Sequence, residues 1–352
     1  MKRYEKLIGI LPAEAAIIMR PANMRYITGG YRGEGCVFVA KGAAVIITDF
    51  RYVEQASREA PAWRVEQTGE GRTMWTICAE LMNEFGLKTC AVESDYIVHD
   101  SYVAMAEKLA GIELVSLSGV IEKIREIKDE HEIECITKAA AIACKAFNNM
   151  LDWVKPGMTE KQVQVRLDYE MLCLGSERNA FSTIAAAGVN GSLPHAIPSD
   201  HVIQNGELLT LDFGAVYGGY LSDMTRTIGF GKIEGELRNI YQYVLDAQLM
   251  CLDAIGPGKV CRDIDAIARY YLDSKYPGRF GHSLGHGVGL FIHEGPRLSK
   301  VSDTVLEPGH VVTVEPGLYI PGLGGVRIED MAIITADGFI NPVDAPKQLI
   351  EL

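Results

Sequence analysis

The first 118 residues alternate short apolar runs with segments whose apolar residues recur at helical spacing. Runs of four or five apolar residues are typical of buried strands, whereas longer amphipathic segments predict helices. The elements expected on this basis are strands at 15–19, 36–40, 44–48 and 90–93 and helices at 51–60, 73–85 and 99–110. Alternating strands and helices of this kind predict an α/β domain.

A charge-dense segment, 121–134, leads into a much longer helical pattern. Its apolar residues recur at helical spacing across Glu130–Val154, so we place a domain boundary just before it and divide the chain into 1–122 and 123–352. Lys155-Pro156-Gly157 ends this helix. Thr159 and Gln162 then form a capping-box pattern, which predicts a further helix to about Leu174.

The second domain contains an internal repeat. Pro156-Gly157 recurs as Pro257-Gly258, and the segment Asn205–Gly214 recurs as Pro308–Gly317. Each half reads as two helices followed by a β-hairpin that carries acidic residues. Two such α+β units would bring their hairpins together about a pseudo-twofold axis.

The first of these hairpins carries Asp212 and Asp223. A turn centred on Tyr217-Gly218 would place the two acids directly opposite each other, with Cβ atoms about 4.5–5.5 Å apart. Two carboxylates at that separation repel each other unless a cation lies between them. Alone, the pair is a signal for a metal ion, with one alternative: one aspartate caps the turn and the other pairs with Arg226.

The repeat favours a metal site over a turn cap and an ion pair, because it supplies a second pair of acids. Glu315 corresponds to Asp212, and Glu329 corresponds to Asp223. Carboxylates are poorly favoured on buried strands, so two pairs at equivalent positions indicate a bound cation.

A glycine-rich segment, Gly281–Arg297, adds the nitrogen donors His282, His286 and His293. Glycines around His286 allow the backbone to approach closely. The spacing is not HExxH, so a single-zinc site on a helix does not fit. Four carboxylates with one imidazole suit Mn²⁺, Fe²⁺ or Co²⁺ at least as well as Zn²⁺. A pair of such ions about 3.5–4 Å apart would activate a shared water for attack on a carbonyl group.

Composition and charge exclude several other classes of function. A net charge of −12 argues against nucleic acid or an anionic membrane as the main partner. No apolar run approaches the roughly 18–20 residues that span a bilayer, and the first residues contain no signal-peptide core. The eight cysteines form no CxxC motif and are expected to be free thiols of a cytoplasmic protein.

Several motifs together resemble a known family. LDFGAVYGGYLSDMTRT, GHSLGHGVGLFIHE, VEPGLY and GVRIED are similar to the active-site signatures of the pita-bread metallopeptidases. That family includes Xaa-Pro aminopeptidases, prolidases and methionine aminopeptidases. REIKDEHEIECITKAA and NMRYITG resemble the proline-specific branch, whose members carry a creatinase-type N-terminal domain that methionine aminopeptidases lack. The implied fold is α+β, with a pita-bread domain at 123–352 after a smaller creatinase-like α/β domain at 1–122.

The resemblance also implies a role for each candidate site residue. Asp212 would chelate one metal ion, Asp223 and Glu329 would bridge two ions, and His286 and Glu315 would bind the second. Glu315 would also assist deprotonation of the bridging water. His195 and His293 would donate hydrogen bonds to the scissile carbonyl oxygen or the developing oxyanion. Arg327 would orient a ligand carboxylate.

The other histidines receive different assignments. His282 either lines the site or packs against it. The histidines expected to be structural are His99, His131, His201 and His310.

The reaction implied is metal-dependent hydrolysis of the N-terminal Xaa-Pro peptide bond by a metal-bridging water or hydroxide. The resemblance implies two divalent ions, Mn²⁺ first and Co²⁺, Zn²⁺ or Fe²⁺ as alternatives, and a homodimer. We favour an Xaa-Pro aminopeptidase slightly over an Xaa-Pro dipeptidase (prolidase), although Arg297 offers a cation for a dipeptide's carboxylate. A peptide-binding protein without activity and a metal-free amidinohydrolase are further alternatives, and the complete ligand set argues against both.

Overall fold

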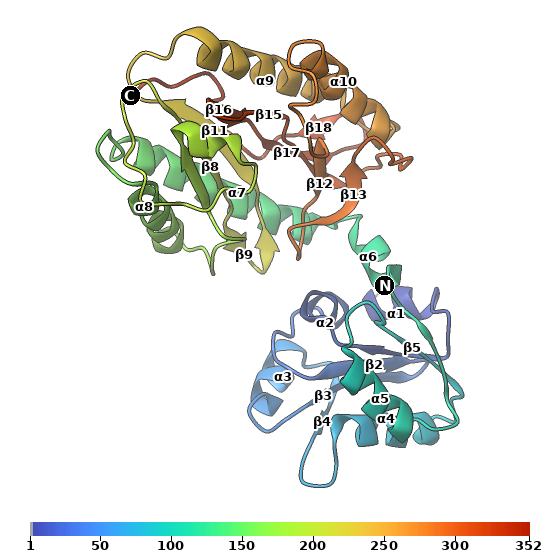
Figure 1. Cartoon of the computed structure of the whole chain (residues 1–352). Coiled ribbons are helices and arrows are strands. Elements are labelled where there is room, and N and C mark those ends of the chain that lie inside the picture. The colour runs from blue at the N-terminus through green and yellow to red at the C-terminus, as the bar shows by residue number, and fades with distance from the viewer. Residues whose placement is uncertain (1–2) are drawn as a thin grey trace. The chain divides into compact units, whose positions relative to one another are not determined.

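The computed structural model describes residues 3–352 (Figure 1). The chain forms two compact units, one ending at Arg125 and the other spanning Glu126–Leu352. Within residues 3–352, no helix is both long enough and apolar enough to cross a membrane.

The first unit is built on one mixed sheet with the strand order β4-β3-β2-β1-β5-β6. β1 and β2 pair antiparallel, as do β2 and β3, and the remaining pairs are parallel. The strands are β1 (Ala15–Ile18), β2 (Cys36–Ala40), β3 (Ala43–Thr48), β4 (Arg64–Gln67), β5 (Thr89–Val92) and β6 (Glu113–Ser116). The helices are α1 (Arg3–Ile8), α2 (Pro21–Thr28), α3 (Val53–Glu59), α4 (Met74–Glu84), α5 (His99–Lys108) and α6 (Val120–Arg125).

The predicted α/β organisation of this unit is confirmed, because all four expected strands and all three expected helices are present. The two strands that the pattern missed, β4 and β6, lie at the edges of the sheet. Their sequences, RVEQ and ELVS, are polar at both ends and only partly buried, so they lack the apolar run of a central strand.

The second unit opens with the two predicted helices. α7 (Glu130–Leu151) begins with a capping box between Asp129 and Glu132, and it ends three residues before the expected Val154. α8 (Glu160–Cys173) begins with the expected capping box between Thr159 and Gln162.

Each helix pair of this unit precedes strands, which confirms the predicted duplication. α7 and α8 precede a sheet of order β11-β8-β7. The second helix pair, α9 (Gly235–Ala254) and α10 (Cys261–Asp273), precedes a sheet of order β13-β12-β14-β17-β18. In Figure 1, α9 and α10 run along the top of this unit, α7 passes behind its strands, and α8 lies at the lower left. The elements are β7 (Ile184–Ala187), η1 (Gly188–Ser192), β8 (Leu208–Phe213), β9 (Val216–Tyr217), β10 (Tyr220–Leu221), β11 (Met224–Gly229), α9 (Gly235–Ala254), α10 (Cys261–Asp273), β12 (Gly285–Gly287), β13 (Glu294–Leu298), β14 (Val311–Val314), β15 (Gly317–Ile320), β16 (Gly324–Arg327), β17 (Asp330–Ile334) and β18 (Phe339–Ile340).

The hairpin that carries Asp212 and Asp223 contacts the hairpin that carries Glu315 and Glu329 close to these acidic residues. The backbone N–H of Glu329 donates to the carbonyl oxygen of Thr225 at 3.1 Å, joining the second hairpin to β11 of the first. This contact brings the repeated acid pairs close to each other, as the pseudo-twofold arrangement predicts.

All eight cysteines lie in the described part of the chain, and none forms a disulfide. Seven are buried and Cys173 is exposed. The prediction of free thiols is therefore confirmed.

Candidate active site

The register of the first hairpin corrects one prediction. Asp212 pairs with Thr225, not with Asp223, because the turn is centred on Gly218-Gly219 rather than on Tyr217-Gly218. Both glycines have positive φ, 57° and 81°, which is the conformation that a two-residue type I′ turn requires. The shift makes Asp223 a diagonal neighbour of Asp212, still on the same face of the hairpin.

The second hairpin has its acids directly opposed. Val314 pairs with Asp330 on one side and Gly317 pairs with Arg327 on the other, in one continuous register. That register places Glu315 across from Glu329.

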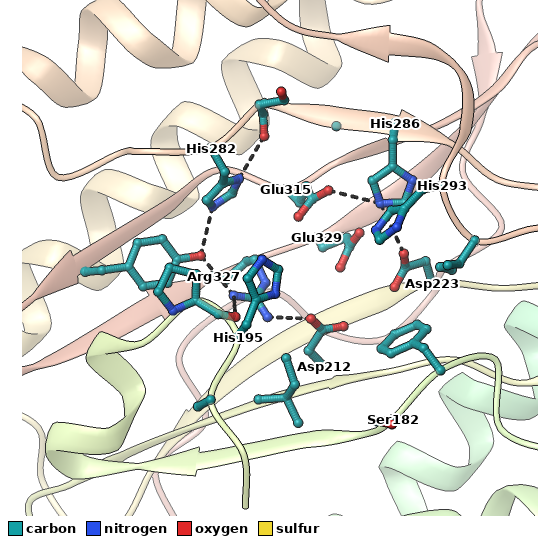
Figure 2. Close-up of a pocket in the computed structure, with 18 of the residues that line it drawn as sticks. Ser182, His195, Asp212, Asp223, His282, His286, His293, Glu315, Arg327 and Glu329 are labelled. Atoms are coloured by element: carbon teal, nitrogen blue, oxygen red, sulfur yellow. Dashed lines mark hydrogen bonds and ion pairs between the residues drawn. The ribbon is translucent and has the colours of Figure 1, made fainter. Parts of the chain in front are cut away.

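The predicted metal ligands converge on one cavity of about 590 Å³ in the second unit (Figure 2). The Nε2 atom of His286 lies 3.3 Å from Oε1 of Glu315 and 3.5 Å from Oδ2 of Asp223. Ligand atoms of Asp223, His286 and Glu329 lie within 4.8 Å of one another. The cavity is lined by all five candidates: Asp212, Asp223, His286, Glu315 and Glu329.

These carboxylates fit a cation, because the protein itself does not neutralise them fully. Burial and the neighbouring Asp212 raise the pKa of Asp223 well above its usual value, and burial and Asp223 do the same to Glu329. Burial is also the main cause that raises the pKa of Glu315 to about 8. Within residues 3–352, Oδ1 of Asp212 and Oε1 of Glu329 are buried without a hydrogen-bond partner. Buried anionic oxygens of this kind are the ligands that hard divalent cations take.

His286 is held in the form that binds metals. Its Nδ1 lies 3.0 Å from the carbonyl oxygen of Gly287 and must carry the proton to donate there. The Nε2 lone pair then points toward the carboxylates. Burial lowers the pKa of His286 to about 4, so the imidazole is neutral near pH 7 and able to act as a ligand.

Arg327 is buried and lines the same cavity. Its guanidinium donates to Asp212, to the Thr225 hydroxyl at 3.1 Å and to the Tyr319 hydroxyl at 2.9 Å. The Tyr319 hydroxyl also lies 2.9 Å from Nε2 of His282. His282 donates from Nδ1 to the Ser283 carbonyl, so its Nε2 accepts from Tyr319. His282 therefore lines the cavity, and hydrogen bonds connect it through Tyr319 and Arg327 to Asp212.

Sequence reasoning assigned no role to Tyr319, Thr225 or Thr313, which hold the charged residues in place. The Thr225 hydroxyl donates to Oε2 of Glu329 at 2.7 Å. The Thr313 hydroxyl donates to Oε1 of Glu315 at 3.1 Å. Their strand positions, opposite or two residues from an acid, are the signal that would have found the two threonines.

His195 and His293 line the cavity, and both are exposed at its surface. The His293 ring lies edge-on to the His286 ring, with centroids 4.5 Å apart. Figure 2 places His195 beside Arg327 and Asp212, on the other side of the acidic cluster from His293. Arg297 also lines this cavity. The apolar part of the lining includes Phe181, Ile184, Pro194, Ala196, Ile197 and Ile292.

The four histidines expected to be structural do not line this cavity. His201 lies 3.0 Å from Glu207, and Nδ1 of His310 accepts from the backbone N–H of Glu307 at 2.9 Å.

Comparison with known proteins identifies the family. Residues 134–336 match Metallopeptidase family M24, and residues 2–127 match the Creatinase/Prolidase N-terminal domain. The chain belongs to metallopeptidase family M24. The predicted pita-bread fold and its creatinase-type N-terminal domain are confirmed with it.

Similar M24 proteins share the whole architecture. A solved Xaa-Pro dipeptidase from Bacillus anthracis superposes with a TM-score of 0.95 at 41% identity, covering 99% of this chain and 98% of its own. The Xaa-Pro dipeptidase of Pyrococcus furiosus is 37% identical over 96% of both chains. A solved X-Pro aminopeptidase from Thermotoga maritima has a TM-score of 0.92 at 32% identity, covering 99% of this chain and all of its own.

Proposed function

We propose that this M24 metallopeptidase hydrolyses Xaa-Pro dipeptides with two divalent ions bound by Asp212, Asp223, His286, Glu315 and Glu329. The observation that supports it is the buried cluster of four carboxylates and one imidazole beside Arg297 in a single cavity. Bound there, the ions would supply Lewis-acid activation of water and of the substrate carbonyl. Mn²⁺ as the ion, a homodimer and a cytoplasmic location stay predictions of the family resemblance.

The side chains in and around the cluster would transfer the proton, stabilise the oxyanion and orient a metal ligand. With the ions bound and its own proton displaced, Glu315 would accept the proton of the attacking water and pass it to the departing proline nitrogen. Burial lowers the pKa of His293, so its ring is neutral near pH 7 and retains one N–H. His293 and His195 donate to the carbonyl oxygen as it becomes an oxyanion. Arg327 holds Asp212 in orientation.

Arg297 is the residue that favours a dipeptide substrate over a longer peptide in this proposal. Its guanidinium lines the same cavity and offers a partner to the C-terminal carboxylate of a short substrate. A longer peptide carries an uncharged amide at that position. The residues alone slightly favoured the aminopeptidase, whereas Arg297 together with relatives named Xaa-Pro dipeptidase favours the dipeptidase.

A comparison of an Xaa-Pro dipeptide with the matching Xaa-Pro-Yaa tripeptide, in added Mn²⁺, tests this proposal. We expect the higher kcat/KM for the dipeptide. A clear preference for the tripeptide would establish the aminopeptidase instead. Absence of hydrolysis with Mn²⁺ or Co²⁺, together with no bound ion, would favour a binding protein.

A further inference from the structure

Glu160, the first residue of α8, is completely buried, and its carboxylate accepts five hydrogen bonds. Its Oε1 accepts from the backbone N–H of Ala187 at 2.6 Å and from Nδ2 of Asn190 at 3.0 Å. Its Oε2 accepts from Nδ2 of Asn190 at 2.8 Å and from the N–H and hydroxyl of Ser199 at 2.8 and 2.7 Å. Every donor comes from one segment, 187–199.

That segment carries His195, and the carboxylate holds it at both ends. The backbone supports the same attachment, because the N–H of Lys161 donates to the Ser199 carbonyl at 3.2 Å. Near the middle, the Pro194 carbonyl accepts from Arg327 at 3.2 Å. The loop is thus fixed to α8 at its ends and to the active site next to His195.

Hydrophobic packing contributes little to the shape of this loop. Its large apolar side chains are exposed: 57% for Val189, 57% for Leu193 and 82% for Ile197. A buried carboxylate is costly unless fully hydrogen-bonded. The N-terminus of α8 and five donors stabilise it here. The polar contacts of Glu160, together with the close backbone packing of Gly191 against Gly325, therefore constrain where the loop, and with it His195, can lie.

We propose that Glu160 is a positioning residue for catalysis, whose carboxylate holds the 187–199 loop so that His195 faces the substrate carbonyl. This inference rests on the proposed function insofar as His195 acts on the substrate. Glu160 itself does not line the cavity, so it acts through the loop.

The substitution Glu160→Gln tests the role with almost no change in shape. Each carboxylate oxygen accepts a backbone N–H, so an amide in either orientation sets its NH₂ group against the N–H of Ala187 or Ser199. One end of the loop must then detach. The matched control is Glu170→Gln, because Glu170 is a buried carboxylate on the same helix whose partners are Asn149 and Arg166.

Hydrogen–deuterium exchange measures how firmly the 187–199 loop is held, and it does not depend on peptidase activity. We expect faster exchange of peptides covering 187–199 in Glu160→Gln, and wild-type exchange there in Glu170→Gln. Unchanged loop exchange in Glu160→Gln would overturn the proposal. If that variant does not fold, Asn190→Ala removes two of the five contacts from the loop side and should show the same change to a smaller degree, and wild-type exchange in it would equally overturn the proposal.

Kinetics then separate positioning from general destabilisation. Displacing an active-site donor costs on the order of 10²-fold, so we expect kcat/KM of Glu160→Gln to fall about 10- to 100-fold. In a His195→Ala background the same substitution should cost nothing further. Full additivity of the two losses would show that Glu160 acts elsewhere. If the wild-type enzyme cleaves no Xaa-Pro peptide, the proposed function fails while the exchange experiment still decides the role of the loop.

Discussion

The Nε2 atom of His286 lies 3.3 Å from Oε1 of Glu315, and one hydroxyl braces both residues. The Thr313 hydroxyl accepts from the backbone N–H of His286 at 3.1 Å and donates to Oε1 of Glu315 at 3.1 Å. Two proposed ligands from different strands thereby share one completely buried support.

Thr313→Val removes this hydroxyl while keeping the side-chain volume. Loss of groups that orient metal ligands typically costs about 10- to 100-fold in metal affinity, so we expect a weakening of that size for Mn²⁺. Isothermal titration calorimetry measures it, with Thr335→Val as the control, since the Thr335 hydroxyl contacts only the exposed Asp337. Wild-type affinity in Thr313→Val would contradict the shared bracing.

Asp223→Ala removes a proposed bridging ligand, and we expect it to abolish both metal binding and peptidase activity. Glu329, between β16 and β17, and His286, on β12, cannot move to replace the missing oxygens, because both are buried. Elemental analysis of the purified protein and a dipeptide assay measure the two losses. Asp246→Asn, on α9 and outside the cavity, serves as the control. Retained activity in Asp223→Ala would show that the ligand assignment is wrong.

The raised pKa values of the acid cluster predict that metal binding releases protons. Burial and mutual repulsion raise the pKa of Asp223, Glu315 and Glu329, so the metal-free site retains protons near pH 7. A divalent ion displaces them, and its affinity should therefore fall as pH is lowered. Calorimetry in two buffers of different ionisation enthalpy gives the number of protons released. Equal heats in both buffers would show that the metal-free carboxylates are already ionised.

The helices and strands could be predicted wherever their burial requires a regular pattern of apolar residues. Central strands such as β2 and β3 are almost entirely apolar because both faces are covered, and α7 was predictable from the helical spacing of its apolar residues. The edge strands β4 and β6 escaped because partial exposure leaves them polar.

The acidic residues of the site were predictable for the opposite reason, since acids on buried strands are out of place. Residue type alone did not single out Tyr319, Thr225 or Thr313, because tyrosine and threonine are what strands ordinarily contain; only their positions relative to the acids distinguish the two threonines. The hairpin register was also misjudged, because the choice between the 217–218 and 218–219 turns depends on backbone φ values that the apolar pattern does not encode.

Arg297→Met should separate dipeptide from tripeptide substrates. Removing the guanidinium leaves the dipeptide's carboxylate without a charged partner, so we expect the dipeptide KM to rise about tenfold or more. The tripeptide, with no carboxylate at that place, should keep its KM within about twofold. Steady-state kinetics on the matched substrates measure both values. An equal rise for the two substrates would remove Arg297 from carboxylate recognition.

Asp330, next to Glu329, is completely buried and joins β17 to the C-terminal segment. Its Oδ1 accepts from Arg226 at 2.8 Å, and its Oδ2 accepts from Lys347 at 2.7 Å. Burial alone would raise the pKa of Asp330, but Arg226 and Lys347 outweigh it and hold this pKa below its usual 3.8. A carboxyl whose pKa is lowered by folding stabilises the protein above its unfolded pKa and loses that contribution as the pH falls through the folded pKa.

Asp330→Asn should therefore destabilise the protein by about 3–5 kcal/mol, because it leaves Arg226 buried without its ion-pair partner. Urea unfolding at pH 7 measures this loss. The variant should also lose less stability than the wild type as the pH falls below 3.8 and through the lowered pKa of Asp330. Asp263→Asn is the control, since the exposed pair of Asp263 with Arg262 should contribute less than about 1 kcal/mol. A variant that matches the wild type at pH 7 would show that backbone carbonyl oxygens alone satisfy Arg226, namely those of Thr225, Glu329, Ala345 and Pro346.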